Sequence, residues 1–243
     1  MLKELARKIF IPAFNPQAFV YAASVGDFLY VEKTLRRHPH AANWENKDGR
    51  TALHITHHWS VACALVGAGA DIERSEPVTG TRPLHAAAQC GNEGIVKLLL
   101  DAGADIHARD AKGQQAIHMA AVSYAPGVLR LLAAKGADID AVAMGFTPLM
   151  LAANDRRDNI VSDLLSLGAD VTLKGPDGRT ADQMVRSHST LKLLAPAKQK
   201  NDAIRHAAVT ETAVQQIVEC LTEGTAATIA VKRPLKLARR VQA

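Results

Sequence analysis

The tripeptide Gly-Ala-Asp occurs four times in this chain of 243 residues, beginning at Gly69, Gly103, Gly136 and Gly168. Successive copies lie 34, 33 and 32 residues apart. A step of this size is typical of solenoids, in which one supersecondary unit is copied and packs against its neighbours. The spacing therefore predicts one elongated array of repeats and favours binding over catalysis.

Residues 82–108 form the clearest single unit. Pro83 suits the first turn of a helix, where its missing N–H would be unpaired anyway, and the alanines that follow have high helix propensity. A Gly-Asn pair ends this helix, and the apolar run 95–100 predicts a second one. Gly103 then stands where a helix C-terminus commonly takes a left-handed residue. A polar turn leads into the next unit.

The same pattern recurs along the chain. Five segments occupy the first-helix start: Thr51-Ala52-Leu53-His54, Arg82-Pro83-Leu84-His85, Gln115-Ala116-Ile117-His118, Thr147-Pro148-Leu149-Met150 and Thr180-Ala181-Asp182-Gln183. An apolar residue precedes each Gly-Ala-Asp glycine by seven positions: Ala62, Val96, Leu129 and Val161. A repeated apolar position is what a continuous core requires.

In these two motifs the chain resembles the ankyrin-repeat family. The family's Thr-Pro-Leu-His start is matched by Thr147-Pro148-Leu149, with Met150 in place of the histidine, and its Gly-Ala-Asp turn is matched four times. The resemblance implies an all-α solenoid of stacked helix-turn-helix units joined by short β-hairpin-like turns. It also implies a non-enzymatic module that binds a protein partner on its concave face.

The repeats divide the chain into three parts. Residues 1–15 are expected to be a capping helix or a disordered leader. Six units follow at 16–47, 48–78, 79–111, 112–143, 144–176 and 177–195. Residues 196–243 are interpreted as a degenerate repeat and a basic C-terminal cap.

Two places break the regularity of these units. A deletion around Thr56 to Ser60 predicts a short first helix in the second unit. Leu191, Leu193 and Leu194 predict the second helix of the last unit, and the polar segment 196–200 a loop after it.

Charge and cysteine content narrow the function classes. Residues 1–184 hold 19 basic and 20 acidic residues, whereas residues 185–243 hold 10 and 4. A nucleic-acid-binding array would need a basic stripe along its length, so no nucleic-acid partner is expected. The three cysteines form no CxxC pair, which favours free thiols in a reducing compartment.

No apolar run approaches membrane-spanning length. We therefore expect a cytoplasmic protein that is a monomer; an exported effector is the alternative. The basic tail, residues 232–240, suits a capping helix, with nuclear import or contact with an anionic membrane as less favoured interpretations.

The histidines invite a chemical interpretation. His54, His85 and His118 lie one unit apart, roughly 10 Å for packed helices, which is too far to share a metal ion. The resemblance implies that they form hydrogen bonds between adjacent repeats. His54, His57 and His58 could share one helix face as ligands, but the shortened unit favours a partner-facing pair. We expect no catalytic residue, no metal site and no cofactor.

Alignment of the units places one set of residues per repeat on the expected binding face. The proposed contact centre lies on the fourth and fifth units, where apolar residues occupy nominally exposed positions. The alternative is that Phe146 and Tyr124 pack onto neighbouring repeats and are half-buried. The full candidate set comprises Trp44, at the expected first hairpin tip, and His57, His58, Gln89, Cys90, Lys112, Val122, Tyr124, Met144, Phe146, Asn154 and Asp155.

Three roles are compatible with such a face. The first is an interaction module or scaffold that binds another protein. A bacterial effector acting on a host protein, and an inhibitor or adaptor that masks an endogenous partner, are the two specific versions.

Overall fold

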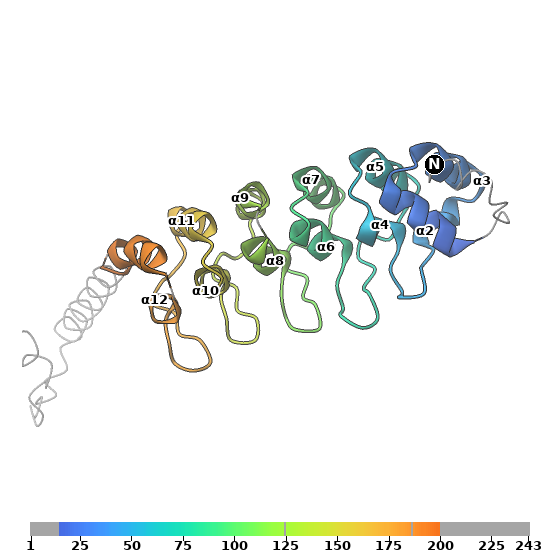
Figure 1. Cartoon of the computed structure of the whole chain (residues 1–243). Coiled ribbons are helices and arrows are strands. Elements are labelled where there is room, and N and C mark those ends of the chain that lie inside the picture. Colours follow the sequence, from blue (N-terminus) through green and yellow to red (C-terminus); the bar gives the residue numbers. More distant parts are fainter. Residues whose placement is uncertain (1–14, 124, 186, 200–243) are drawn as a thin grey trace, which may run out of the picture. The chain divides into compact units, whose positions relative to one another are not determined.

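The computed structural model describes residues 15–123, 125–185 and 187–199. Helices alternate along this part of the chain (Figure 1), and it contains no β-strand beyond isolated bridges. The first helices of the units are α2 (Pro16–Val25), α4 (Ala52–Ile55), α6 (Pro83–Gln89), α8 (Ala116–Val122), α10 (Pro148–Asn154) and α12 (Ala181–Met184). The second helices are α3 (Phe28–Arg37), α5 (Trp59–Gly67), α7 (Glu93–Asp101), α9 (Pro126–Ala134) and α11 (Asp158–Ser166), with a 3-10 helix, η1 (Pro39–Asn43), after α3.

The helices form two layers. Each first helix packs against the first helix of the next unit, and each second helix against the next second helix. Loops project from the layer of first helices and carry the turns between units (Figure 1). The repeated apolar position is confirmed as core, because Ala62, Val96, Leu129 and Val161 are each 0% exposed. The predicted solenoid of stacked helix pairs is confirmed.

The Gly-Ala-Asp motif ends each of four second helices with the same backbone geometry. At α7, the N–H of Gly103 donates to the carbonyl of Leu100, and the N–H of Ala104 donates to that of Leu99. This pair of bonds is a Schellman motif, which requires a left-handed residue, and Gly103 has φ 95°. Asp105 then accepts a hydrogen bond from the N–H of His107, 2.9 Å away. The aspartates of the four motifs therefore serve turn formation, since each accepts a hydrogen bond from the N–H two residues further on.

The predicted histidine bridges between repeats are also present. In the fourth unit, His118 Nδ1 accepts from the N–H of Gln115 at 3.2 Å. The opposite ring nitrogen, Nε2, therefore carries the proton and donates to the carbonyl of Ala141, in the loop that leads into the next unit, 3.0 Å away. His54 makes the equivalent contact to the carbonyl of Thr81, and His85 to the carbonyls of Ala108 and Gln114. Each histidine ties its own helix start to the next repeat.

The irregular units differ in part from expectation. The first helix of the second unit is short, as predicted, since α4 has four residues whereas α6 has seven. The predicted loop at 196–200 is wrong, because residues 188–199 are helical and the expected boundary at 195/196 falls inside that helix. Lys198 Nζ donates to Asp182 at 2.7 Å and holds this part of the helix against α12. The expected N-terminal cap and the degenerate C-terminal repeat lie outside the described residues.

Candidate partner-binding face

The loops between units pack against one another at their tips. A Cβ atom placed on Gly49 would lie 2.4 Å from the ring of Pro77 in the next tip, and one on Gly145 would lie 2.5 Å from Pro176. Only glycine leaves room for such contacts, and both glycines also have positive φ. We call the surface formed by these tips and the adjoining first helices the hairpin face.

Hydrogen bonds join the tips where no proline does so. The N–H of Ala111 donates to the carbonyl of Thr79 at 2.8 Å, which links the third and fourth tips. Arg109 Nη1 donates to the carbonyl of Val142 at 2.9 Å, which links the fourth and fifth. The tips are thus held at fixed spacing, and a partner meets an ordered edge.

Several tip residues expose apolar side chains. Val78 is 81% exposed, Val142 49% and Met144 65%. Met144 and Gly145 form the two-residue turn of the fifth hairpin, between bridge partners Ala143 and Phe146, with φ values of 51° and 83°. A methionine in the left-handed region is strained, since asparagine or glycine is the usual choice in such a turn. Strained residues of this kind cluster at binding sites.

A pocket of about 250 Å³ opens beside the fifth tip, between the fifth and sixth units. Its apolar lining comes from α10, α12 and the fifth hairpin, which precedes α10, and its polar lining comes from α10 and the sixth tip. The lining includes Phe146, Met150 and Met184, together with Asn154, Asp177 and Arg179.

Two departures from the repeat pattern create this pocket. Met150 occupies the slot in which His118 bridges to the next unit, and it is buried but has no ring nitrogen to donate. The short helix α12 has four residues, so it covers less of α10 than a seven-residue helix would. The result is a hollow with two flexible methionine side chains at its base. Methionine side chains adapt readily to different ligand surfaces.

The rim of the pocket is polar and charged. Arg179 and Asp177 form an ion pair, and hydrogen bonds from Arg179 hold the pKa of the Asp177 carboxyl below its usual value. On the other side, Asn154 Nδ2 donates to Asp155 Oδ1 at 3.2 Å. An apolar floor with a hydrogen-bonding rim is typical of a pocket that receives one anchoring side chain of a partner.

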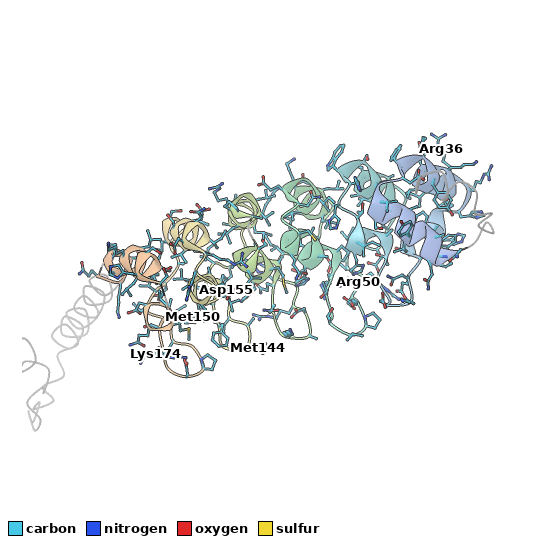
Figure 2. All side chains as sticks on the ribbon, in the orientation of Figure 1. Arg36, Arg50, Met144, Met150, Asp155 and Lys174 are labelled. Atoms are coloured by element: carbon cyan, nitrogen blue, oxygen red, sulfur yellow. The ribbon has the colours of Figure 1, made fainter. Side chains whose placement is uncertain are left out.

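Of the predicted residues, those on loops and helix ends are exposed. Figure 2 shows Met144 on the loops and Asp155 above them, in the layer of the first helices. The exposed members are His57, His58, Gln89, Cys90, Lys112, Met144, Asn154 and Asp155. Among these, burial of the Cys90 sulfur raises the pKa of its thiol, which favours the neutral form. The structure brings Phe146 and Asn154 together in the pocket, with Met144 two residues from Phe146.

Three predicted residues are positioned differently from expectation. Trp44 does not lie at the first hairpin tip, because it precedes the bridge between Glu45 and Thr51 and packs edge-on against Phe19, with ring centroids 5.6 Å apart. Val122 and Phe146 are half-buried, which matches the alternative considered for Phe146. Tyr124 lies outside the described residues.

His57 and His58 do not share a helix with His54, because α4 ends at Ile55 and both histidines lie in the turn before α5. The His58 ring packs against Gly26, where a Cβ would approach its Nε2 to 2.6 Å. Within the part of the chain that the structure describes, no three His, Cys, Asp or Glu residues are grouped to hold a metal ion. No helix in that part is long and apolar enough to cross a bilayer.

Sequence reasoning missed Met150 and Met184 as parts of the site. The signal for Met150 was present, because a methionine interrupts a slot that is histidine in three preceding units. The pocket itself could not be predicted from this methionine, because it also depends on the residue at which α12 ends.

The fold and the face together define a class of protein: a helical solenoid that presents an ordered row of loops. A family model described as ankyrin repeats in three copies matches residues 19–110 and 102–175, which is more than half of the chain. The chain belongs to the ankyrin-repeat family. Ankyrin repeats are protein–protein interaction modules, and the family is non-enzymatic.

Similar proteins agree with this assignment. Ankyrin repeat and SAM domain-containing protein 6 of Mus musculus is 35% identical over 102 residues, which cover 41% of this chain and 11% of that protein. Neurogenic locus notch homolog protein 2 of Homo sapiens is 37% identical over 119 residues, which cover 48% and 5%. The chain thus spans only a small part of the length of these relatives.

Among solved structures, the ankyrin repeat domain of Bcl-3, described as a unique member of the IkappaB protein family, superposes with a TM-score of 0.64. The match covers 80% of this chain and 89% of that domain at 24% sequence identity. At this identity the likeness shows the fold alone.

Proposed function

We propose that the chain binds a protein partner on its hairpin face, with the contact centred on the fifth tip and the pocket beside it. The observation that carries this proposal is Met144, a 65% exposed apolar side chain held in a strained left-handed turn next to the pocket. An apolar anchor of the partner would enter the pocket, and the exposed predicted residues on neighbouring units would form the rim of the contact.

The mechanism we propose is rigid presentation. Proline contacts and hydrogen bonds between tips fix the spacing of the loops before a partner arrives. Binding then orders fewer protein groups, so less conformational entropy is lost.

The finer role depends on the partner. An effector that acts on a host protein and an inhibitor or adaptor that masks an endogenous site would both use this face. We propose that the chain acts as a monomer. We also propose that it resides in the cytoplasm, because the free thiols of Cys63 and Cys90 suit a reducing compartment. The charge balance of the repeats argues against a nucleic-acid partner.

The test begins with affinity purification and mass spectrometry to identify proteins that the full chain captures. The same experiment is repeated with Met144→Ala combined with Asn154→Arg, which removes the tip side chain and extends a long one over the pocket rim. We expect this variant to lose its specific partner, with affinity reduced by roughly tenfold or more.

The matched control is Lys97→Ala combined with Arg130→Ala, two exposed side chains on the second helices α7 and α9. This control should retain the partner. Equal retention by the two variants, with both folded by circular dichroism, would show that the hairpin face is not the binding surface.

A further inference from the structure

A second surface lies away from the hairpin face, in the layer of second helices at the N-terminal side of the array. A groove of about 740 Å³ separates α3 from α5. Phe28 and Leu35 line it on α3, and Trp59 begins the opposite wall on α5. In Figure 2 Arg36, which also lines this groove, projects from the side opposite to the loop that carries Met144. The groove is therefore separate from the proposed partner-binding face.

Among the residues that the structure describes, those lining the groove carry a single pair of charges. Glu32 and Arg36 form an ion pair at 2.8 Å, so their charges balance within the groove. The helix α5 has no charged residue between Trp59 and Gly67, whereas the other second helices each contain charged residues. Such walls select an occupant by its apolar surface and favour neither sign of charge.

The α5 wall is shaped to admit another helix. Ser60, Cys63, Ala64 and Gly67 line the groove at i, i+3, i+4 and i+7, the spacing of one helix face. Their small side chains allow close approach, and a Cβ on Gly67 would meet nothing within 4 Å. Trp59 stands at the beginning of this face with 59% of its surface exposed. At 1.5 Å per residue the face is about 11 Å long.

The segment that precedes α2 has a matching pattern in its sequence. Four of its residues recur at the spacing of one helix face and would form an apolar stripe: Leu2, Leu5, Ala6 and Ile9. In the same helix, all the charged residues of the segment fall on the other side: Lys3, Glu4, Arg7 and Lys8. The stripe therefore has the same spacing and the same length as the small-residue face of α5.

The position of α2 brings this segment within reach of the groove. Two residues join α2 to α3, and the two helices pack against each other, so they run antiparallel. Pro16 therefore lies beside the end of α3, where Pro39 lines the groove. Six residues separate Ile9 from Pro16. They can span about 20 Å when extended, and so short a connection keeps the segment at an effective concentration on the order of millimolar.

We propose that residues 2–9 form an amphipathic helix that docks in the groove between α3 and α5 of the same molecule. Equivalent helices of adjacent units run in the same direction, so Gly67 lies at the end of the groove nearest the start of α2. The docked helix then runs antiparallel to α5, with Ile9 beside Gly67 and Leu2 beside Trp59. Because it contacts α3 and α5 at once, it holds the first two units together. This inference goes beyond the proposed function, because no residue of the groove belongs to the hairpin face.

The reactivity of the Cys63 thiol reports whether the groove is filled. The full chain carries Cys90→Ser and Cys220→Ser, which leaves Cys63 as its one thiol, and its rate of alkylation by iodoacetamide is measured. Leu5→Asp puts a charge on the apolar stripe and should raise this rate by about tenfold or more, because the thiol reacts while the segment is undocked. The matched control, Arg7→Asp, alters the charged side and should leave the rate unchanged.

A disulfide test establishes which side of the segment faces α5. In the same background, Ala6→Cys places a thiol on the stripe opposite the middle of α5, and Glu4→Cys places one on the charged side. With glutathione disulfide as the oxidant, Ala6→Cys should form an internal disulfide with Cys63 about tenfold faster than Glu4→Cys, because bonded cysteines need Cα atoms roughly 4.4–6.8 Å apart. Mass spectrometry of unreduced peptides identifies the bond. Since Ala6→Cys keeps the stripe apolar, this test does not depend on how Leu5→Asp folds.

Three results would overturn the proposal. Equal alkylation rates for Leu5→Asp and Arg7→Asp would mean that the segment lies elsewhere and leaves the groove to another protein. Equal disulfide rates for Ala6→Cys and Glu4→Cys would mean that the segment reaches Cys63 without docking its apolar stripe. Disulfides between chains, in a yield that rises with protein concentration, would make a second copy the occupant.

Discussion

Met144 combines an exposed apolar side chain with a left-handed backbone. The backbone conformation lowers the stability of the fold, whereas the apolar side chain favours binding of a partner. Met144→Asn should stabilise the fold by about 1 kcal/mol, because asparagine followed by glycine is favoured in a two-residue hairpin turn. The same substitution should weaken partner binding, because it removes the apolar contact. Urea unfolding and a binding assay on the same preparation would measure both effects.

The control is Val142→Asn in the same loop. Val142 is 49% exposed but is not among the residues with positive φ, so its replacement relieves no backbone strain. A gain in stability equal to that of Met144→Asn would contradict the assignment of strain to the turn.

At the scale of single residues, sequence reasoning succeeded where the role of a residue follows from its position in the repeat. The role of His118 followed from the family resemblance, and the left-handed glycine of Gly103 followed from helix-end chemistry. Trp44 was misplaced because the hairpin base and the tip are only a few residues apart in sequence. Aromatic packing against Phe19, a contact across the first unit, decides where it lies.

At the scale of elements, the packing of one hairpin tip on the next can be separated from backbone strain. Gly145 has φ 83° and lies under Pro176, whereas Gly178 has φ 75° and open space around it. Alanine at either position incurs the left-handed penalty, roughly 1 kcal/mol. Only Gly145→Ala also displaces a neighbouring ring, so its loss of unfolding free energy, measured by chemical denaturation, should be clearly larger. Equal losses would show that contacts between tips contribute little.

Helix ends were harder to predict than helix positions. The short α4 could be inferred from a deletion, because the next second helix begins at a fixed distance. The predicted end of the helix at 188–199 was too early, because Pro196 and the polar residues after it are typical of a loop. A proline within a helix removes one backbone hydrogen bond, and the contact between Lys198 and Asp182 helps to offset that loss.

At the scale of the whole molecule, the histidine bridges make stability depend on pH. Burial lowers the pKa of His54, His85 and His118, even though hydrogen bonds to backbone carbonyls act in the opposite direction. The folded chain therefore stays neutral at these sites where the unfolded chain takes up protons. Stability should be fully present above about pH 6.5 and should fall as the pH drops below it.

Denaturant unfolding at a series of pH values would measure this loss. His118→Gln is the matched variant, because Gln183 occupies the equivalent slot in the sixth unit and accepts a hydrogen bond from the N–H of Thr180 at 3.1 Å. The variant should have a shallower acid slope, by at most about 1.4 kcal/mol per pH unit. An unchanged slope would mean that His118 does not contribute to the pH dependence.

The dependence of each unit on its neighbours alone has a mechanical consequence. A tensile load applied to the two ends passes through every inter-unit contact in series, so the weakest contact yields first and the others stay intact. Each released unit of about 33 residues lengthens the chain by roughly 110 Å of extended backbone. The extension measured under an increasing load should therefore rise in steps of this size.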